Sequence, residues 1–151
     1  MLSAQQVQEI IRQGVPQAED LDLRIEEVSD QHSLARIPFH SRLIRPGGTL
    51  SGPTLMALGD AAMYALVLGK LGPTDRGPTD RGPTDRGPTE MAVTSNLNIN
   101  FLSKPQPVDL MAKAKLLRMT RRQAVCEVAL YSAGNEDELV AHVTGTYALP
   151  L

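Results

Sequence analysis

Residues 51–73 read SGPTLMALGDAAMYALVLGKLGP, and this segment sets the architecture of the whole 151-residue chain. Between residues 55 and 68, twelve of the fourteen residues are apolar, and the two exceptions are Gly59 and Asp60. A helix with apolar residues on nearly every face must be buried on most of them. Pro53 suits the first turn of a helix, where its missing N–H costs no hydrogen bond. We therefore predict a buried central helix over residues 54–71, too short and too interrupted to span a membrane.

Strands are predicted on both sides of this helix. After it, apolar and polar residues alternate with a period of two, which indicates a strand with one buried face. The apolar set is Met91, Val93, Leu97, Ile99 and Phe101, and the polar set is Thr94, Asn96, Asn98 and Asn100. Further strands are expected near residues 21–28, 33–39, 110–116, 124–131 and 139–148. Because no strand–helix–strand alternation occurs, the sheet should be antiparallel and wrap around the central helix, in an α+β fold.

The chain has the size of one domain. Residues 2–13 are predicted to form an amphipathic helix that starts with Ser3 and Gln6 as a capping box and is ended by Gly14 and Pro16. Residues 1–20 are therefore assigned to an N-terminal helix, and residues 21–151 to a single domain. Within that domain, residues 72–90 read GPTDRGPTDRGPTDRGPTE, a repeat whose period of five is too short for a solenoid unit. The Gly and Pro in every unit favour a solvated loop, and a lid or partner-docking loop is the alternative.

Composition excludes several classes of protein. The formal net charge is −2, aromatic residues make up 3% of the chain and Trp is absent, so no nucleic-acid-binding surface is expected. Cys126 is the single cysteine, which excludes an internal disulfide, and the three histidines lack the spacing of metal ligands. We therefore expect no metal, no nucleic acid and no membrane as partners. The first residues, MLSAQQVQEI, show no signal-peptide pattern, which favours a cytoplasmic protein.

Asp60 is the residue that points to chemistry. Burying a carboxylate without partners is costly. Asp60 is therefore satisfied by nearby backbone or hydroxyl groups, faces a wet gap between subunits, or faces a ligand cavity as a functional carboxylate. The small neighbours Gly59, Ala61 and Ala62 leave room for a ligand and favour the last interpretation.

The start of the central helix is a second candidate. Backbone N–H groups in a first helical turn lack intrahelical partners, so those at Gly52 form a potential oxyanion or phosphate site. A glycine loop that only needs positive φ angles is the alternative. Gly52 and Asp60 are about 12 Å apart along a helix, so one carbonyl group cannot touch both in the same chain. If both serve one reaction, one of them comes from another copy, which predicts an active site at a dimer interface.

Four segments together resemble the hotdog-fold thioesterases, and most closely the phenylacetate-degradation (PaaI-like) family. They are residues 51–73, TEMAVTSNLNINFLSKP at residues 89–105, the Lys-Ala-Lys strand around residue 114, and AHVTGTYALP at residues 141–150. The resemblance covers roughly residues 21–150, with the repeat as an insertion after the helix. It implies the hotdog fold and a homodimer, commonly paired into a homotetramer.

The resemblance also implies a reaction, the hydrolysis of an acyl-CoA thioester, with coenzyme A as part of the substrate and no separate cofactor. Asp60 falls on the family's carboxylate, which acts as base or nucleophile. Gly52 falls on the backbone N–H that stabilises the oxyanion, and Thr94 on the hydroxyl that helps to place water. The candidate substrate-binding residues are Arg45, Ser51, Pro53, Ser95 and Asn96.

The sequence departs from the family pattern before the helix. Ser51 and Pro53 replace the His and the second Gly of a His-Gly-Gly segment, and Arg45 replaces an Asn. A non-catalytic acyl-CoA-binding domain is therefore the alternative function. A hotdog dehydratase is a third hypothesis, and it would pair Asp60 with a histidine. The histidines that remain for it are His40 and His142. Basic residues that either attract a CoA phosphate or form a solvated strand face are Lys113, Lys115, Arg118, Arg121 and Arg122.

Overall fold

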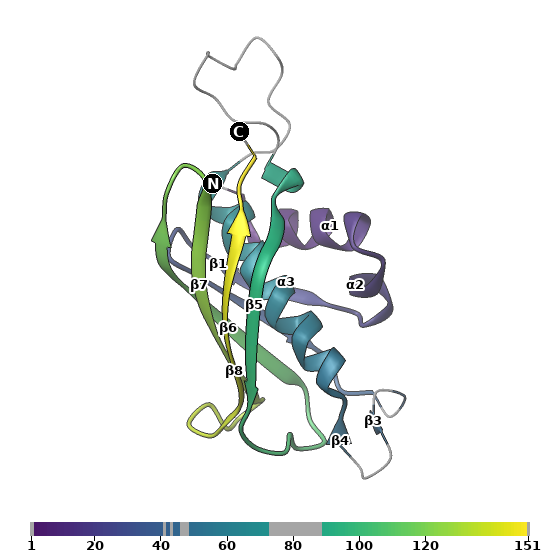
Figure 1. Ribbon diagram of the computed structural model, residues 1–151. Coiled ribbons are helices and arrows are strands. Elements are labelled where there is room, and N and C mark those ends of the chain that lie inside the picture. Colours follow the sequence, from purple (N-terminus) through teal and green to yellow (C-terminus); the bar gives the residue numbers. More distant parts are fainter. Residues whose placement is uncertain (1, 41, 43, 46–48, 73–88, 151) are drawn as a thin grey trace.

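The computed structural model describes residues 2–40, 42, 44–45, 49–72 and 89–150. A six-stranded antiparallel sheet, in the order β1-β2-β6-β7-β8-β5, curls around the long helix α3 (Figure 1). The helices are α1 (Ala4–Gly14), α2 (Pro16–Asp20), α3 (Gly52–Leu71) and the short 3-10 helix η3 (Thr89–Met91). The sheet strands are β1 (Arg24–Val28), β2 (His32–Ile37), β5 (Val93–Phe101), β6 (Leu110–Met119), β7 (Gln123–Ser132) and β8 (Leu139–Ala148). The predicted α+β architecture, an antiparallel sheet around a central helix, is confirmed.

Helix α3 forms the centre of the core. Ser51 caps its N-terminus by accepting a hydrogen bond from Thr54 N at 3.3 Å, and Pro53 lies in its first turn, as predicted. Gly72 follows its last turn with a φ of +83°, a conformation that favours glycine. Residues on several faces of the helix are fully buried, which explains its lack of a polar stripe. They include Leu58, Ala62, Met63, Ala65, Leu66, Val67 and Leu68.

The length of α3 differs from the prediction. The helix begins at Gly52 and has 20 residues. It is the one helix in the described ranges that is long and apolar enough, by length and composition alone, to cross a membrane. Of the most apolar 18-residue stretch of this helix, 56% is buried inside the protein. The prediction that it is too short for a span was therefore wrong about its length, whereas its role as a core helix is confirmed.

Two glycines allow α3 to lie against β8. A Cβ atom on Gly59 would lie 3.1 Å from Val143 Cγ2, and one on Gly145 would lie 2.6 Å from Met63 Sδ. Side chains at these positions would push the helix away from the strand. Gly59 therefore serves helix–sheet packing, and the expectation that it leaves room for a ligand is wrong.

The N-terminal segment forms two helices instead of one. The capping box of Ser3 and Gln6 starts α1 as predicted. After Gly14 only Val15 is extended, and a second helix, α2, begins at the next residue. Pro16 occupies the first turn of α2, a position that suits proline. Ile11 of α1 is fully buried in the main core, and Gln8 Oε1 accepts a hydrogen bond from Ile25 N at 2.9 Å. These helices therefore share the core of the sheet domain.

Strand β5 differs from the predicted half-buried strand. It is an edge strand that pairs with β8, and its Val93 and Phe101 side chains are 59% and 55% exposed. The register shifts between Thr94 and Asn96, so Ser95 is an extra residue in the strand. This bulge turns Thr94 toward α3, on the same face as Leu97. Strict alternation had placed the two on opposite faces.

Two further segments flank α3 in the sequence. A ribbon of β3 (Ile44–Arg45) and β4 (Thr49–Leu50), which the sequence analysis did not predict, precedes the helix. The predicted repeat loop at residues 72–90 falls largely on residues 73–88, which lie outside the described residues.

Candidate active site

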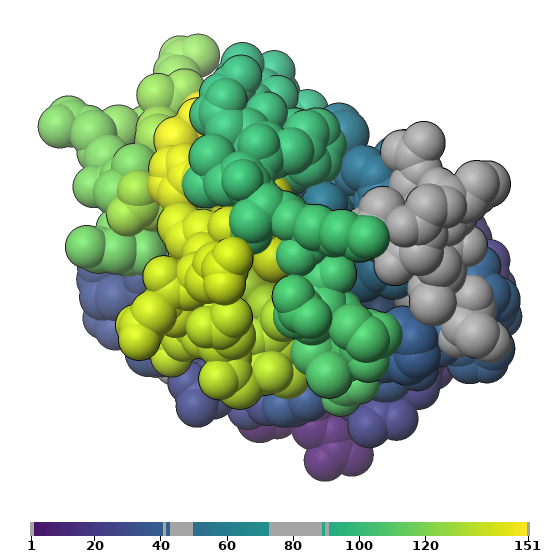
Figure 2. Space-filling view, turned by 90° about the horizontal axis from the view of Figure 1, so that it is seen from below, coloured from purple at the N-terminus to yellow at the C-terminus, as the bar shows by residue number. Residues whose placement is uncertain are grey.

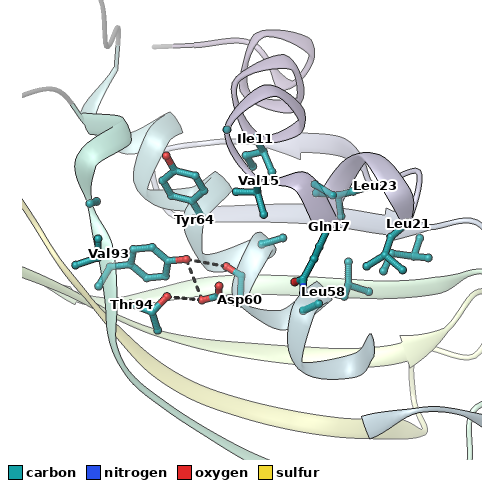
Figure 3. Close-up of a pocket in the computed structure, with 17 residues that line it drawn as sticks. Ile11, Val15, Gln17, Leu21, Leu23, Leu58, Asp60, Tyr64, Val93 and Thr94 are labelled. Atoms are coloured by element: carbon teal, nitrogen blue, oxygen red, sulfur yellow. Dashed lines mark hydrogen bonds between the residues drawn. The ribbon is translucent and has the colours of Figure 1, made fainter. Parts of the chain in front are cut away.

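A cavity of about 320 Å³ lies beside Asp60, between α3, the two N-terminal helices and the ends of β5 and β8 (Figure 3). Its volume is within the range of small-molecule sites. Asp60 is one of the residues in its wall, so this side chain faces a cavity. Apolar side chains make up most of the rest of the wall. The described residues that line it are Ile11, Gly14, Val15, Gln17, Ala18, Leu21, Leu23, Ile37, Ala57, Leu58, Asp60, Ala61, Tyr64, Ala92, Val93, Thr94 and Tyr147.

Two hydroxyl groups hold the Asp60 carboxylate. Thr94 Oγ1 donates a hydrogen bond to Asp60 Oδ1 at 2.7 Å (Figure 3). The Tyr147 hydroxyl donates to the same oxygen at 2.9 Å. Within the described residues, no hydrogen bond to Oδ2 is recorded. One oxygen of the carboxylate is thus fixed by protein donors, and the other is left for a ligand or water. Asp60 is therefore both satisfied by hydroxyl groups and exposed to a cavity, two interpretations that the sequence analysis treated as alternatives.

Tyr147 is the buried member of this group, with 3% of its surface exposed. Its ring stacks on Tyr64, with a centroid separation of 5.7 Å and an interplanar angle of 7°. Burial and the neighbouring Asp60 carboxylate raise the pKa of Tyr147 far above its ordinary value of 10. Tyr147 therefore remains a neutral hydrogen-bond donor to Asp60 throughout the range in which enzymes work.

The raised pKa predicts a dependence of stability on alkaline pH. The folded protein holds the Tyr147 proton more tightly than the unfolded chain does, so this contribution to stability is complete below pH 10 and is lost as the pH rises. The free energy of unfolding should fall above pH 10 by up to about 1.4 kcal/mol per pH unit. Urea unfolding at pH 9, 10 and 11 should show a smaller fall for Tyr147→Phe. Equal slopes in the two proteins would contradict the assignment.

The predicted residues at the start of α3, Ser51, Gly52 and Pro53, lie apart from this cavity. The Ser51 hydroxyl is engaged in the helix cap and lies 2.9 Å from Thr54 Oγ1. Gly52 is the first residue of α3, and a Cβ atom there would lie 3.2 Å from the Phe101 ring. Arg45 belongs to β3 and pairs with Thr49 of β4. Among the residues whose side chains the structure describes, Ser51, Gly52 and Pro53 do not line the cavity at Asp60.

The structure therefore separates the predicted residues into two groups. Asp60 and Thr94 meet in the cavity wall. Ser95 is exposed and donates a hydrogen bond to Thr146 O at 3.2 Å, while the neighbouring Asn96 is also exposed; neither lines the cavity. Gly52 and Asp60 lie eight residues apart on the single helix α3, so they stay apart within one chain, as their spacing predicted.

Sequence reasoning missed three polar residues of the cavity, Tyr64, Tyr147 and Gln17. Tyr64 lies four residues after Asp60 on one helix, so helical spacing was a usable signal. Tyr147 lies two residues after Gly145 on β8, and strand alternation places both on the face toward α3. No pattern in the sequence indicated that Gln17 would reach into the cavity, because α2, which carries it, was not predicted as a separate helix.

A second hollow, of about 610 Å³, lies on the face of the sheet that turns away from α3. His142 is in its wall, and its Nε2 lies 3.3 Å from Glu127 Oε2. The other dehydratase candidate, His40, accepts a hydrogen bond from Arg42 N at 3.2 Å. Neither histidine lines the cavity at Asp60, so the structure lends no support to a His–Asp dehydratase pair. The predicted basic residues are exposed, as for a solvated face: Lys113, Lys115, Arg118, Arg121 and Arg122.

Comparisons with known proteins agree with this fold. The family model described as "Thioesterase superfamily" matches residues 47–139. A candidate thioesterase from Silicibacter sp. TM1040 is 31% identical, with coverage of 100% of this chain and 94% of that chain and a TM-score of 0.80. A thioesterase from Haemophilus influenzae is 16% identical, with coverage of 98% and 90% and a TM-score of 0.76. A mutant of a thioesterase from Pseudomonas aeruginosa is 19% identical, with coverage of 100% and 96% and a TM-score of 0.75.

No curated protein matches the chain in a sequence search. The two structures below 25% identity establish the shared hotdog-type fold alone. The family model spans more than half of the chain, and it includes both Asp60 and the start of α3. On this evidence, the chain belongs to the thioesterase superfamily.

Proposed function

We propose that the protein hydrolyses acyl-CoA thioesters, as a member of the PaaI-like branch of the superfamily. The observation that carries this proposal is the Asp60 carboxylate, held at Oδ1 by Thr94 and Tyr147 in the wall of an apolar cavity. An apolar cavity suits the acyl group, and a carboxylate with one free oxygen suits the activation of water.

Asp60 acts as a general base in the first version of the reaction. Its Oδ2 takes a proton from a water molecule, whose oxygen attacks the thioester carbonyl carbon. The C–S bond then breaks, the proton passes from Asp60 to the departing sulfur of coenzyme A, and the acid is released. In the second version, Oδ2 attacks the carbonyl carbon itself, the thiolate leaves, and water hydrolyses the resulting anhydride. In both versions Thr94 and Tyr147 orient the carboxylate through Oδ1.

A backbone N–H at the start of α3 stabilises the oxyanion. The carbonyl oxygen gains negative charge as the nucleophile attacks, and an N–H in the first turn of a helix points at such a charge. Gly52 supplies this group in the proposed site. Because Gly52 and Asp60 of one chain are about 12 Å apart on α3, the N–H comes from a second copy of the chain. Ser51 and Pro53, the sequence neighbours of Gly52, then border the substrate on the coenzyme A side, and we assign Arg45 to the same side.

The second copy binds at the edge strand β5. This strand pairs with β8 alone among the described strands, and its exposed apolar side chains include Val93 and Phe101. Figure 2 shows β5 and the segment after it, in green, at the surface between β8, in yellow, and the blue region near the start of α3. An unpaired edge with apolar side chains is a template for another strand. Antiparallel pairing of two β5 edges would extend the sheet and set two α3 helices side by side in opposite directions.

Release of free thiol from a panel of acyl-CoA thioesters tests this function. We expect turnover of at least one thioester by the purified protein. The alternative, a non-catalytic acyl-CoA-binding domain, predicts that the same compounds raise the melting temperature while no thiol is released. That result would contradict the proposed hydrolysis.

A further inference from the structure

We propose that the cavity beneath α1 and α2 is the acyl-group pocket, and that it admits uncharged, apolar acyl groups of up to about ten carbon atoms. This inference rests on the proposed function, because it takes Asp60 as the residue beside the thioester carbonyl. It adds a substrate class and names the N-terminal helices as the part of the chain that limits acyl length.

Helix α3 forms one wall of this pocket with a regular stripe. Ala57, Asp60, Ala61 and Tyr64 all line the cavity, and their spacing of three, one and three residues places them on one side of the helix. The two alanines are half-buried and flank Asp60 with the smallest side chains the stripe could carry. Room for a ligand is therefore provided at Ala57 and Ala61, next to the carboxylate.

The N-terminal helices form the opposite wall. Ile11 lies on α1, Val15 joins the two helices and Ala18 lies on α2, and all three line the cavity. Figure 3 shows Ile11 and Val15 above the segment of α3 that carries Asp60. Ile11 and Ala18 are buried, so this wall is packed into the core and limits the depth of the cavity.

The chemistry of the lining selects the acyl group. Asp60 is the one charged side chain among the described lining residues, and apolar groups from Leu21, Leu23 and Leu58 surround the remaining space. An acyl group that carried its own carboxylate would place a second negative charge near Asp60 in an apolar surrounding, at a high cost in binding. An apolar, uncharged acyl group fits this lining.

The volume limits the size of the group. The cavity holds about 320 Å³. A water molecule, which is close to a methylene group in size, takes up about 30 Å³, so the pocket holds on the order of ten non-hydrogen atoms. Each methylene group that enters an apolar pocket raises binding roughly fourfold, whereas a chain too long for the pocket must displace packed side chains or bind out of position, which lowers kcat/KM.

Hydrolysis of straight-chain acyl-CoA esters tests the limit. We expect kcat/KM to rise by about 10²-fold between butanoyl-CoA and octanoyl-CoA and then to fall for hexadecanoyl-CoA. Hydrolysis of hexadecanoyl-CoA as fast as octanoyl-CoA would overturn the inference while leaving the thioesterase function in place.

Ala57→Leu tests the location of the pocket. The larger side chain occupies part of the cavity, so the ratio of kcat/KM for octanoyl-CoA to that for butanoyl-CoA should fall at least about tenfold. The matched control is Ala129→Leu, because Ala129 is also half-buried but lines the hollow on the outer face of the sheet. An equal ratio in both variants would refute the pocket. Leu21→Ala, which enlarges the cavity, should move the preference toward longer chains, and it decides the question if Ala57→Leu does not fold.

A binding measurement separates this inference from the proposed hydrolysis. If the wild-type protein hydrolyses no thioester, the rise in its melting temperature with butanoyl-, octanoyl- and hexadecanoyl-CoA is measured instead. The inference then requires the largest rise with octanoyl-CoA, and the loss of that preference in Ala57→Leu. A rise that does not depend on acyl length would overturn it.

Discussion

Asp60→Asn is expected to lower kcat for thioester hydrolysis by about 10³-fold, because general acid–base catalysis contributes about 10²- to 10⁴-fold. An amide accepts the hydrogen bonds from Thr94 and Tyr147 through its own oxygen, so the fold and the cavity should be kept. The amide can neither take a proton from water nor attack the carbonyl carbon. Stopped or continuous thiol-release assays give kcat and KM, and KM should change far less than kcat.

A surface aspartate provides the control for this substitution. Asp137 is exposed in the turn between β7 and β8, and Asp137→Asn makes the same chemical change away from the cavity. We expect wild-type kcat in the control and equal melting temperatures in the two variants. If Asp60→Asn kept more than about a tenth of the wild-type kcat, a role in acid–base catalysis would be ruled out.

Gly52→Pro is expected to lower kcat by about 10²- to 10³-fold, the effect of removing one oxyanion donor. Proline has no N–H and is accepted in the first turn of a helix. Ser51, the residue before it, has a ψ of 153°, which is the extended conformation that a following proline requires. The substitution therefore removes the N–H at a helical position that accepts proline, and equal melting temperatures of the proline and alanine variants check that α3 is kept.

Gly52→Ala is the matched control for Gly52→Pro. Alanine keeps the N–H but places a Cβ atom at the same position, 3.2 Å from the Phe101 ring. Any loss caused by that contact appears in both variants, whereas loss of the oxyanion donor appears only with proline. Equal kcat in the two variants would show that the Gly52 N–H does not act on the substrate.

Mixing the two inactive variants tests the shared site. When Asp60→Asn and Gly52→Pro chains form mixed dimers, one of the two sites combines an intact Asp60 with an intact Gly52 from the partner. Half of the dimers in a random mixture are mixed, so about a quarter of the wild-type activity should return. No recovery in a mixture shown to contain mixed dimers would contradict a site built from two chains.

Much of the fold follows from patterns within short stretches of sequence. The apolar run with Pro53 at its start required a buried helix, and alternation over β5 to β8 required strands. The capping box of Ser3 and Gln6 located the start of α1. Boundaries were less accurate, and α2 was missed, because Pro16 was taken as the end of a helix when it begins another. Proline is common both just after the end of a helix and in the first turn of one, so only the packing of the residues after Pro16 distinguishes the two cases.

Some residues of the candidate site were predicted and others were missed, and the physical reason is different for each. Asp60 was found because one charge within an apolar run requires compensation wherever the helix lies. Tyr147 was missed because it lies 87 residues from Asp60, and no local pattern links the two. Ala61 was expected to make room for a ligand and does line the cavity, but Gly59 packs against Val143 instead.

The sequence alone predicted that residues 54–71 form a buried helix with one carboxylate in need of partners, since helix formation and the cost of burying charge are local properties. The tertiary structure established which groups meet that carboxylate. The extra residue Ser95 reverses the strand's alternation and turns Thr94 toward Asp60, and the folding of α1 and α2 over α3 encloses the cavity. Bulges and helix packing depend on contacts between distant segments, which is why the chain had to be folded before its site could be seen.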